Sequence, residues 1–339
     1  MQAEAATRRQ APMSGGASAP PRVRSFSIPQ NKRWEVCLLL SKLQERFRKE
    51  WLFLLMMLPG LVLTAIFSYG PMYGIIMAFQ DYNPGLGYGG SPWVGWANFK
   101  LIFSQPAFLV TIRNTFFISF MKIVFGTVAS VVFALQLNEI RQNGPKRVFQ
   151  TIVYIPNFIS WVIMAGILTD ILGTNGIINE VVKGLGGKPV QFLSNRGVFP
   201  WTLIFTDMWK TFGFGTVVYL ATMTGIDPEL YESAVIDGAG RWRQTWSITL
   251  PMLIPIIILM TVLALGNVLS AGFDQVYNLY SPSVFPTGDI IDTYVYRAGL
   301  QSGKYAIGTA VGLFKSLVSS VLISTSLFVA YKFAGYKVF

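Results

Sequence analysis

The sequence contains no histidine and a single cysteine, Cys37, among its 339 residues. The absence of histidine excludes Ser-His-Asp and Cys-His nucleophile systems, imidazole zinc sites and histidine proton relays. One cysteine allows no internal disulfide, no CxxC redox pair and no iron–sulfur cluster. The chain therefore lacks the side chains on which much hydrolytic, metal-dependent and redox chemistry depends.

Charged residues are also scarce. Only 13% of the residues are charged and 52% are hydrophobic, whereas ordinary soluble domains carry roughly 25% charged residues. The 27 basic residues outnumber the 16 acidic ones, which gives a net charge of +11. Nucleic-acid binding requires a basic face on a soluble fold, but here the basic residues lie mostly at the margins of apolar segments. This pattern predicts a membrane protein without a nucleic-acid partner.

Six apolar stretches approach or exceed the length of about 20 residues that a membrane-spanning helix needs. They predict an all-α membrane protein whose transmembrane domain, residues 51–339, has six transmembrane helices at about 51–80, 114–138, 148–169, 199–225, 252–272 and 305–331. Pro59 and the Tyr69-Gly70-Pro71 step are expected to bend or break the first helix.

The chain begins with a segment that is too polar to form a core. Residues 1–33 are rich in Pro, Ser, Gly and Ala, which predicts a disordered cytoplasmic tail without the apolar region of a secretory signal. Residues 34–50 place apolar side chains near one helical face. They predict an amphipathic helix at the membrane surface, although an extension of the first span fits the pattern equally well.

The distribution of basic residues predicts the orientation. With the N-terminus in the cytoplasm, seventeen of the 27 basic residues lie on the cytoplasmic side and seven in external loops, as the positive-inside rule requires. Six spans would place both termini in the cytoplasm.

The predicted cytoplasmic loop 225–251 reads GIDPELYESAVIDGAGRWRQTWSITLP. Asp227 and Pro228 form a helix-start signal, which predicts a helix over 228–236. Asp237-Gly238 ends that helix, and a second helical run is expected over 241–249. The loop is too polar to enter the membrane, so it predicts a capped helical hairpin that contacts another protein.

This loop resembles the EAA loop of the permease subunits of type I ATP-binding-cassette importers for carbohydrates. The residues that match the family pattern in order and spacing are Glu232-Ser233-Ala234, Asp237-Gly238-Ala239, Trp242, Ile248 and Leu250-Pro251. Ser233 stands where the family more often has Ala. The stretches YGPMYGIIMAFQDYNP, WVGWANFKLIF and FDQVYNLYSP extend the resemblance over nearly all of the chain after residue 50, and the chain looks closest to the permeases of bacterial alginate importers.

The resemblance implies a type I permease fold in the bacterial inner membrane and a coupling helix that docks on an ATPase. It assigns the coupling role to Tyr231, Glu232, Ser233, Ala234, Asp237, Gly238, Ala239 and Trp242. The implied partners are a second permease subunit, two ATPase subunits, an external solute-binding protein and an oligosaccharide cargo, with alginate or another acidic oligosaccharide as the best candidate.

The chain itself has no nucleotide-binding motif. A P-loop requires GxxxxGK followed by Ser or Thr, and the nearest segments, 187–189 and 303–305, lack that hydroxyl. We therefore expect a non-catalytic subunit without a cofactor, with ATP and Mg bound by the partner ATPase subunits.

Four charged residues fall within the predicted spans, where each costs about 2.5–3.5 kcal/mol or more on insertion scales. Asp207 and Lys210 are three residues apart and can neutralise each other. Lys122 and Lys315 have no obvious partner, and snorkelling from near a helix end is an alternative explanation for them. Three lysines against one aspartate favour an anionic sugar as cargo.

Polar residues in the fifth predicted span provide further pathway candidates. Asn267, Ser270 and Asp274 have spacings of three and four, which place them on one face of a continuous helix. The resemblance to maltose-type permeases adds Trp209 and Lys210, and it also favours Asn267 and Ser270. Interhelical hydrogen bonding is the alternative role for the last two. The predicted substrate-pathway residues are Trp209, Lys210, Asn267, Ser270, Asp274, Lys122 and Lys315.

Two other function classes fit the sequence less well than an importer subunit. A self-contained channel or secondary transporter for a polar solute would work without an ATPase and would leave the cytoplasmic hairpin without a role. A membrane enzyme is disfavoured by the lack of histidine and of a convergent pair of intramembrane carboxylates.

Overall fold

A computed structural model describes residues 50–140 and 142–334. The predicted tail 1–33 and nearly all of the predicted surface helix 34–50 lie outside the described residues. The described part is helical and contains no strand, with one isolated bridge between Gln80 and Trp93, so the all-α prediction is confirmed. The chain divides into two compact units, residues 1–71 and 72–339, and each is described by itself.

The first unit contributes one apolar helical segment. Residues 50–64 are α-helical, the π-helix η1 follows at Ala65–Tyr69, and the 3₁₀-helix η2 begins at Gly70 and ends at Phe79. No side chain between residues 50 and 71 is buried.

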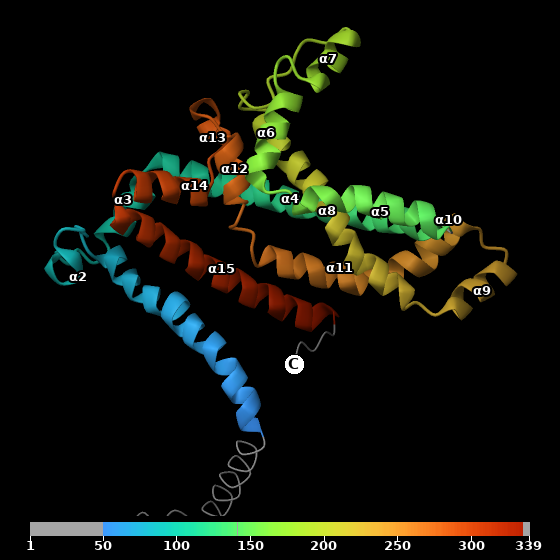
Figure 1. The fold of residues 1–339 in the computed structure, drawn as a ribbon, viewed down its shortest axis with the longest axis horizontal. Coiled ribbons are helices and arrows are strands. Elements are labelled where there is room, and N and C mark those ends of the chain that lie inside the picture. Colours follow the sequence, from blue (N-terminus) through green and yellow to red (C-terminus); the bar gives the residue numbers. More distant parts are fainter. Residues whose placement is uncertain (1–49, 141, 335–339) are drawn as a thin grey trace, which may run out of the picture. The chain divides into compact units, whose positions relative to one another are not determined.

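The second unit contains the remaining elements (Figure 1). They are α2 (Gly87–Gly90), α3 (Ala97–Ser104), α4 (Pro106–Glu139), α5 (Asn143–Phe158), α6 (Trp161–Leu172), α7 (Ile177–Gly184), α8 (Phe199–Thr224), α9 (Pro228–Ile236), α10 (Arg241–Gln244), η3 (Thr245–Thr249), α11 (Leu250–Leu265), α12 (Phe273–Leu279), η4 (Pro282–Val284), α13 (Phe285–Gly288), α14 (Ile291–Val295), η5 (Tyr296–Gln301) and α15 (Tyr305–Ala334). Helix α8 lies along α4 and α5, and α15 lies along α11.

Five helical segments among the described residues are long and apolar enough to cross a membrane. They are Glu50–Phe79, Pro106–Glu139, Trp161–Gly184, Arg241–Leu265 and Tyr305–Phe328. The fourth predicted span corresponds to α8, which has 26 residues but is not one of the five. Helix α8 carries both Asp207 and Lys210, which make it less apolar than the others.

The third predicted span is interrupted. Helix α5 ends at Phe158 and α6 begins at Trp161, so the expectation of one continuous helix over 148–169 is wrong. Pro156 lies in the last turn of α5 and has no N–H to donate. Ser160 then acts as the N-cap of α6, because its side-chain oxygen accepts a hydrogen bond from the Ile163 N–H at 3.4 Å.

The fifth predicted span is interrupted as well. Helix α11 ends at Leu265, residues 266–269 form turns, residues 270–272 have no regular secondary structure, and α12 starts at Phe273. Gly272 has φ +89°, a left-handed conformation that glycine adopts readily. The prediction that Asn267, Ser270 and Asp274 share one helical face is therefore wrong. We call residues 266–272 the break segment.

An ion pair between the buried Asp289 and the partly exposed Arg297 lies in the region between α12 and α15, and Asn114 of α4 binds the backbone of this region. Arg297 donates to both oxygens of Asp289, at 3.2 and 2.6 Å, and Thr293 donates to the same carboxylate at 2.7 Å. Asn114 of α4 donates to the backbone carbonyl oxygens of Pro286 and Asp289. Burial acts to lower the pKa of Arg297, but the hydrogen bonds and charge of Asp289 outweigh it and raise that pKa above its usual value.

We expect Arg297→Ala to destabilise the protein by about 3–5 kcal/mol, because it leaves the buried carboxylate of Asp289 without its cation. The control is Arg241→Ala, which removes an exposed ion pair with Glu139 at 3.6 Å and should change stability by about 0–1 kcal/mol. Thermal unfolding of the purified membrane protein measures both. Equal effects of the two substitutions would contradict a structural role for the Asp289–Arg297 pair.

Candidate functional site

A polar cavity of about 270 Å³ lies where the break segment meets α4 and α8. Its walls come from three parts of the sequence that are far apart, and it is lined by Ser119, Lys122, Ile123, Asp207, Ala264, Asn267, Ser270, Ala271 and Gly272. Polar side chains are costly inside a membrane and commonly mark a functional site there. The cavity is therefore the main candidate for a binding site within the helices.

Lys122 is the central group at this cavity. Its side chain is only 9% exposed, and its ammonium nitrogen donates to the Ala271 carbonyl oxygen at 2.7 Å, to Asp207 Oδ1 at 3.3 Å and to Gln275 Oε1. An ammonium group has three N–H donors, so these three acceptors match its capacity. Lys122 thereby connects α4, α8, the break segment and α12.

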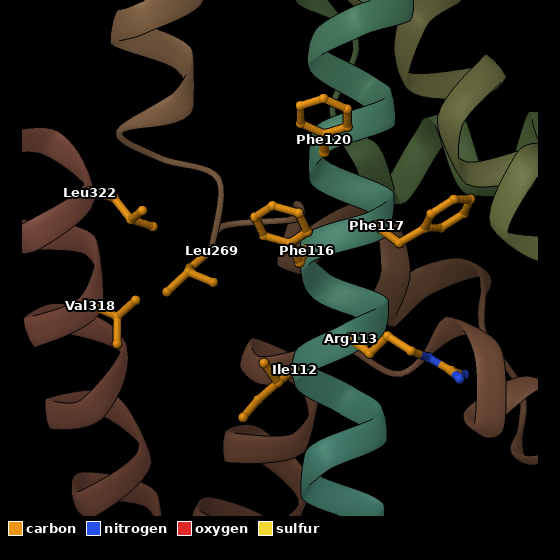
Figure 2. Close-up of a pocket in the computed structure, with 8 residues that line it drawn as sticks. All are labelled: Ile112, Arg113, Phe116, Phe117, Phe120, Leu269, Val318 and Leu322. Carbon is orange, nitrogen blue, oxygen red and sulfur yellow. The ribbon is translucent and has the colours of Figure 1, made fainter. Parts of the chain in front are cut away.

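The break segment turns different side chains in different directions. Asn267 and Ser270 line the polar cavity and are exposed, whereas Val268 and Leu269 are buried. Leu269 lines a second, apolar pocket of about 610 Å³ between α4 and α15. Figure 2 shows Leu269 on the same side of α4 as Phe116, with Val318 and Leu322 facing it from α15.

The structure separates the predicted pathway residues into two groups. Lys122, Asn267 and Ser270 line the polar cavity together with Asp207. The other four do not line it. Trp209 belongs to an apolar groove of about 450 Å³ beside α6, Asp274 is exposed on α12, and Lys210 and Lys315 have partners elsewhere.

All three intramembrane lysines contact acceptors within the protein. Lys315 pairs with Asp292 at 2.5 Å, and Asp207 pairs with Lys122. Lys210 is buried and donates to the carbonyl oxygens of Pro156 and Asn157, at 3.2 and 2.8 Å. The expectation that Lys122 and Lys315 lack partners is therefore wrong. Their charges consequently provide no evidence for an anionic cargo.

Sequence reasoning missed two residues that shape the cavity. Ser119 lies three residues before Lys122 on α4, so helical spacing predicts that both face the same way. Gln275 is buried, and its Nε2 donates to the Leu203 carbonyl oxygen at 2.8 Å and to Thr206 Oγ1 at 2.9 Å. Its role depends on the position of α12, for which the sequence contains no signal.

The predicted hairpin forms a second candidate surface. Helix α9 covers Pro228–Ile236, the range expected from the sequence, and Asp227 Oδ1 accepts a hydrogen bond from the Glu229 N–H at 3.0 Å. Gly238 has φ +78°, and the Ala239 N–H donates to the Ala234 carbonyl oxygen at 2.8 Å. These contacts end the helix in a left-handed C-cap.

The exposed side of the hairpin has both apolar and acidic character. No residue of α9 is buried, and Ile236 and Trp242 are 86% and 75% exposed. Among the described residues, the carboxylates of Glu232 and Asp237 have no hydrogen-bonding or ion-pair partner. Exposed large apolar groups beside polar ones are typical of protein-binding surfaces.

Two other predicted hairpin residues make hydrogen bonds within the hairpin: Tyr231 is half-buried, whereas Ser233 is exposed. The Tyr231 hydroxyl bonds to Thr249 Oγ1 at 2.9 Å, which connects α9 to η3. Ser233 Oγ donates to the Leu230 carbonyl oxygen at 3.1 Å, so a hydroxyl at this position is satisfied within the helix. The hairpin is therefore held together by its own hydrogen bonds.

The chain is similar to two proteins of Bacillus subtilis (strain 168) over most of their length. Protein LplB of Bacillus subtilis (strain 168) is 42% identical over 288 residues, which cover 84% of this chain and 90% of that protein. The polygalacturonan/rhamnogalacturonan transport system permease protein YteP of the same strain is 39% identical over 297 residues, which cover 87% of this chain and 91% of that protein.

A solved structure also has the same fold. A chain of a bacterial alginate ABC transporter, crystallised with an alginate pentasaccharide-bound periplasmic protein, superposes with a TM-score of 0.80 at 36% identity, covering 88% of this chain and 100% of that chain. The family model described as binding-protein-dependent transport system inner membrane component matches residues 123–333. This chain therefore belongs to the family of inner-membrane components of binding-protein-dependent transport systems.

Proposed function

We propose that this chain is a permease subunit of an ATP-driven importer and forms half of the translocation pathway for an oligosaccharide. The observation that supports this most directly is the polar cavity at the break segment, where Asn267, Ser270 and Asp207 gather within an apolar helical protein. Amide, hydroxyl and carboxylate groups hydrogen-bond well to the hydroxyls of a sugar. The name of the relative YteP and the description of the solved alginate transporter both refer to saccharide transport.

Energy for transport enters through the hairpin. Helix α9 and its C-cap dock on a separate ATPase subunit, and ATP and Mg bind to that subunit. The exposed apolar and acidic side chains of the hairpin support this assignment. The permease chain itself binds no cofactor, and no cluster of three potential metal ligands is found among the residues that the structure describes.

The complete transporter consists of this chain, a second permease subunit, two ATPase subunits and an external solute-binding protein. The hairpin and both termini face the cytoplasm, in agreement with the excess of basic residues on that side. The solved alginate transporter was crystallised with a periplasmic protein, which supports an analogous delivery step here.

The cargo is an acidic oligosaccharide, with alginate as the leading candidate. This assignment rests on the relatives, because the solved transporter imports "the acidic polysaccharide alginate" and YteP is named for polygalacturonan and rhamnogalacturonan. The intramembrane lysines do not contribute to it, since each has an acceptor within the protein.

We expect ATP-dependent uptake only from the complete assembly. Proteoliposomes that contain this chain, its partner permease and the ATPase should accumulate an oligouronate when ATP is inside and the binding protein outside. Omission of the ATPase should abolish uptake. Flux through this chain alone would instead support a self-contained channel or secondary transporter.

We expect Asn267→Ala and Ser270→Ala each to raise the cargo concentration needed for half-maximal uptake by about three- to tenfold, the equivalent of one lost hydrogen bond. Ser324→Ala is the matched control, because Ser324 lies on α15 and bonds only to the Ser320 carbonyl oxygen. Uptake assays over a range of cargo concentrations measure the effect. An unchanged half-saturation in both cavity variants would exclude the cavity as the sugar site.

We expect Gly238→Val to separate ATP hydrolysis from uptake, because a side chain in the left-handed conformation costs about 1–2 kcal/mol, and more when it is β-branched. Gly238→Asn is the control, since asparagine tolerates this conformation and should retain uptake. The ratio of sugar transported to ATP hydrolysed is the measurement. If Gly238→Val transports as much sugar per ATP hydrolysed as the unsubstituted protein, the α9 C-cap has no role in coupling.

A further inference from the structure

The two breaks in the predicted spans share a feature that the sequence does not reveal. Lys210 donates to the carbonyl oxygens of Pro156 and Asn157 at the end of α5. Lys122 donates to the carbonyl oxygen of Ala271 in the break segment. In each case a buried lysine from a neighbouring helix provides the donor for backbone carbonyl groups at an interrupted helix.

The surroundings of Lys122 fit a structural role better than a cargo-binding one. All three of its N–H donors have acceptors within the protein, so none is left for a ligand. Gly272 allows this approach, because a Cβ atom at that position would lie 3.2 Å from the Lys122 nitrogen. Only one oxygen of Asp207 is bonded to Lys122, which leaves the other for a hydroxyl group in the cavity.

We propose that Lys122 is a positioning residue of the transport pathway. It fixes the non-helical conformation of the break segment and orients Asp207, but it does not contact the cargo. This proposal rests on the proposed function of the cavity as a sugar site. Leu269 anchors one side of the break segment in the apolar pocket between α4 and α15 (Figure 2), and Lys122 anchors its other end at Ala271. Between these anchors, Ser270 is presented to the cavity.

One consequence concerns specificity. The charges of Lys122 and Asp207 balance each other across 3.3 Å, so this half of the pathway presents hydrogen-bonding groups without a net positive charge. The cavity therefore recognises the hydroxyl groups of the sugar. Selection for the carboxylates of an acidic oligosaccharide belongs to the other components of the transporter.

The first test compares two cargoes that differ in whether each uronate carries a carboxylate or a neutral hydroxymethyl group. Lys122→Met and Lys122→Gln are assayed in the complete reconstituted transporter with an oligouronate and with the same oligomer after reduction of its carboxyl groups. Removing one partner of a buried ion pair is strongly disruptive, so we expect uptake to fall by about tenfold or more in Lys122→Met, equally for both cargoes. A loss confined to the acidic cargo in either variant would overturn the proposal.

The second test reports the position of the break segment without relying on transport. Cys37, the one cysteine of the sequence, is replaced by Ser, and a single cysteine is introduced as Ser270→Cys or, as a control, Gln301→Cys. Because Lys122→Met removes one anchor of the break segment, we expect the rate at which a polar maleimide labels position 270 to change by about tenfold. The labelling rate at position 301 should stay the same. Lys122→Arg, which keeps charge and donors, should partly restore the original rate.

An unchanged labelling rate at position 270 in Lys122→Met would show that Lys122 does not position the segment. This outcome is distinct from a failure of the proposed function. If the cavity is not an aqueous pathway, the cysteine at position 270 will not react even when Lys122 is present.

Discussion

A backbone carbonyl group inside a membrane must have a hydrogen-bond donor, because lipid cannot provide one. Continuous helices meet this requirement internally, so each interruption needs a donor from another part of the protein or from water in a cavity. The structure provides it twice with a lysine, Lys210 at the end of α5 and Lys122 at the break segment. The polar cavity lies at the second interruption, where Asn267 and Ser270 line it together with Asp207.

The cavity and the hairpin are built on different principles. The cavity combines residues that are far apart in the sequence, and Lys122 alone contacts three other parts of the chain, through Asp207, Ala271 and Gln275. The hairpin depends on contacts between close neighbours, such as Asp227 with Glu229 and Ala234 with Ala239. The cavity therefore depends on the relative positions of several helices, whereas the shape of the hairpin is fixed locally.

This difference explains how much the sequence alone could predict. The bounds of α9 follow from signals within a few residues, an N-cap, a proline in the first turn and a glycine at the end, and the structure has the same bounds. The all-α class and the family follow from apolar length and the hairpin motif. The breaks at 159–160 and 266–272 were not predicted, because an apolar segment shows where a helix can continue but not where a distant lysine stabilises an interruption. The partners of Lys122 and Lys315, which are 85 and 23 residues away in the sequence, were missed for the same reason.

The exposed face of α9 also has a consequence for how the subunit is produced. Ile236 and Trp242 are 86% and 75% exposed on a hairpin in which α9 buries no side chain. A copy made without its partner would present these apolar groups to the surrounding protein-folding machinery, much as an unfolded segment does. With the hairpin docked on an ATPase subunit as proposed, balanced synthesis of the two subunits would limit chaperone retention and proteolysis, and assembly would act as a checkpoint for the abundance of this chain.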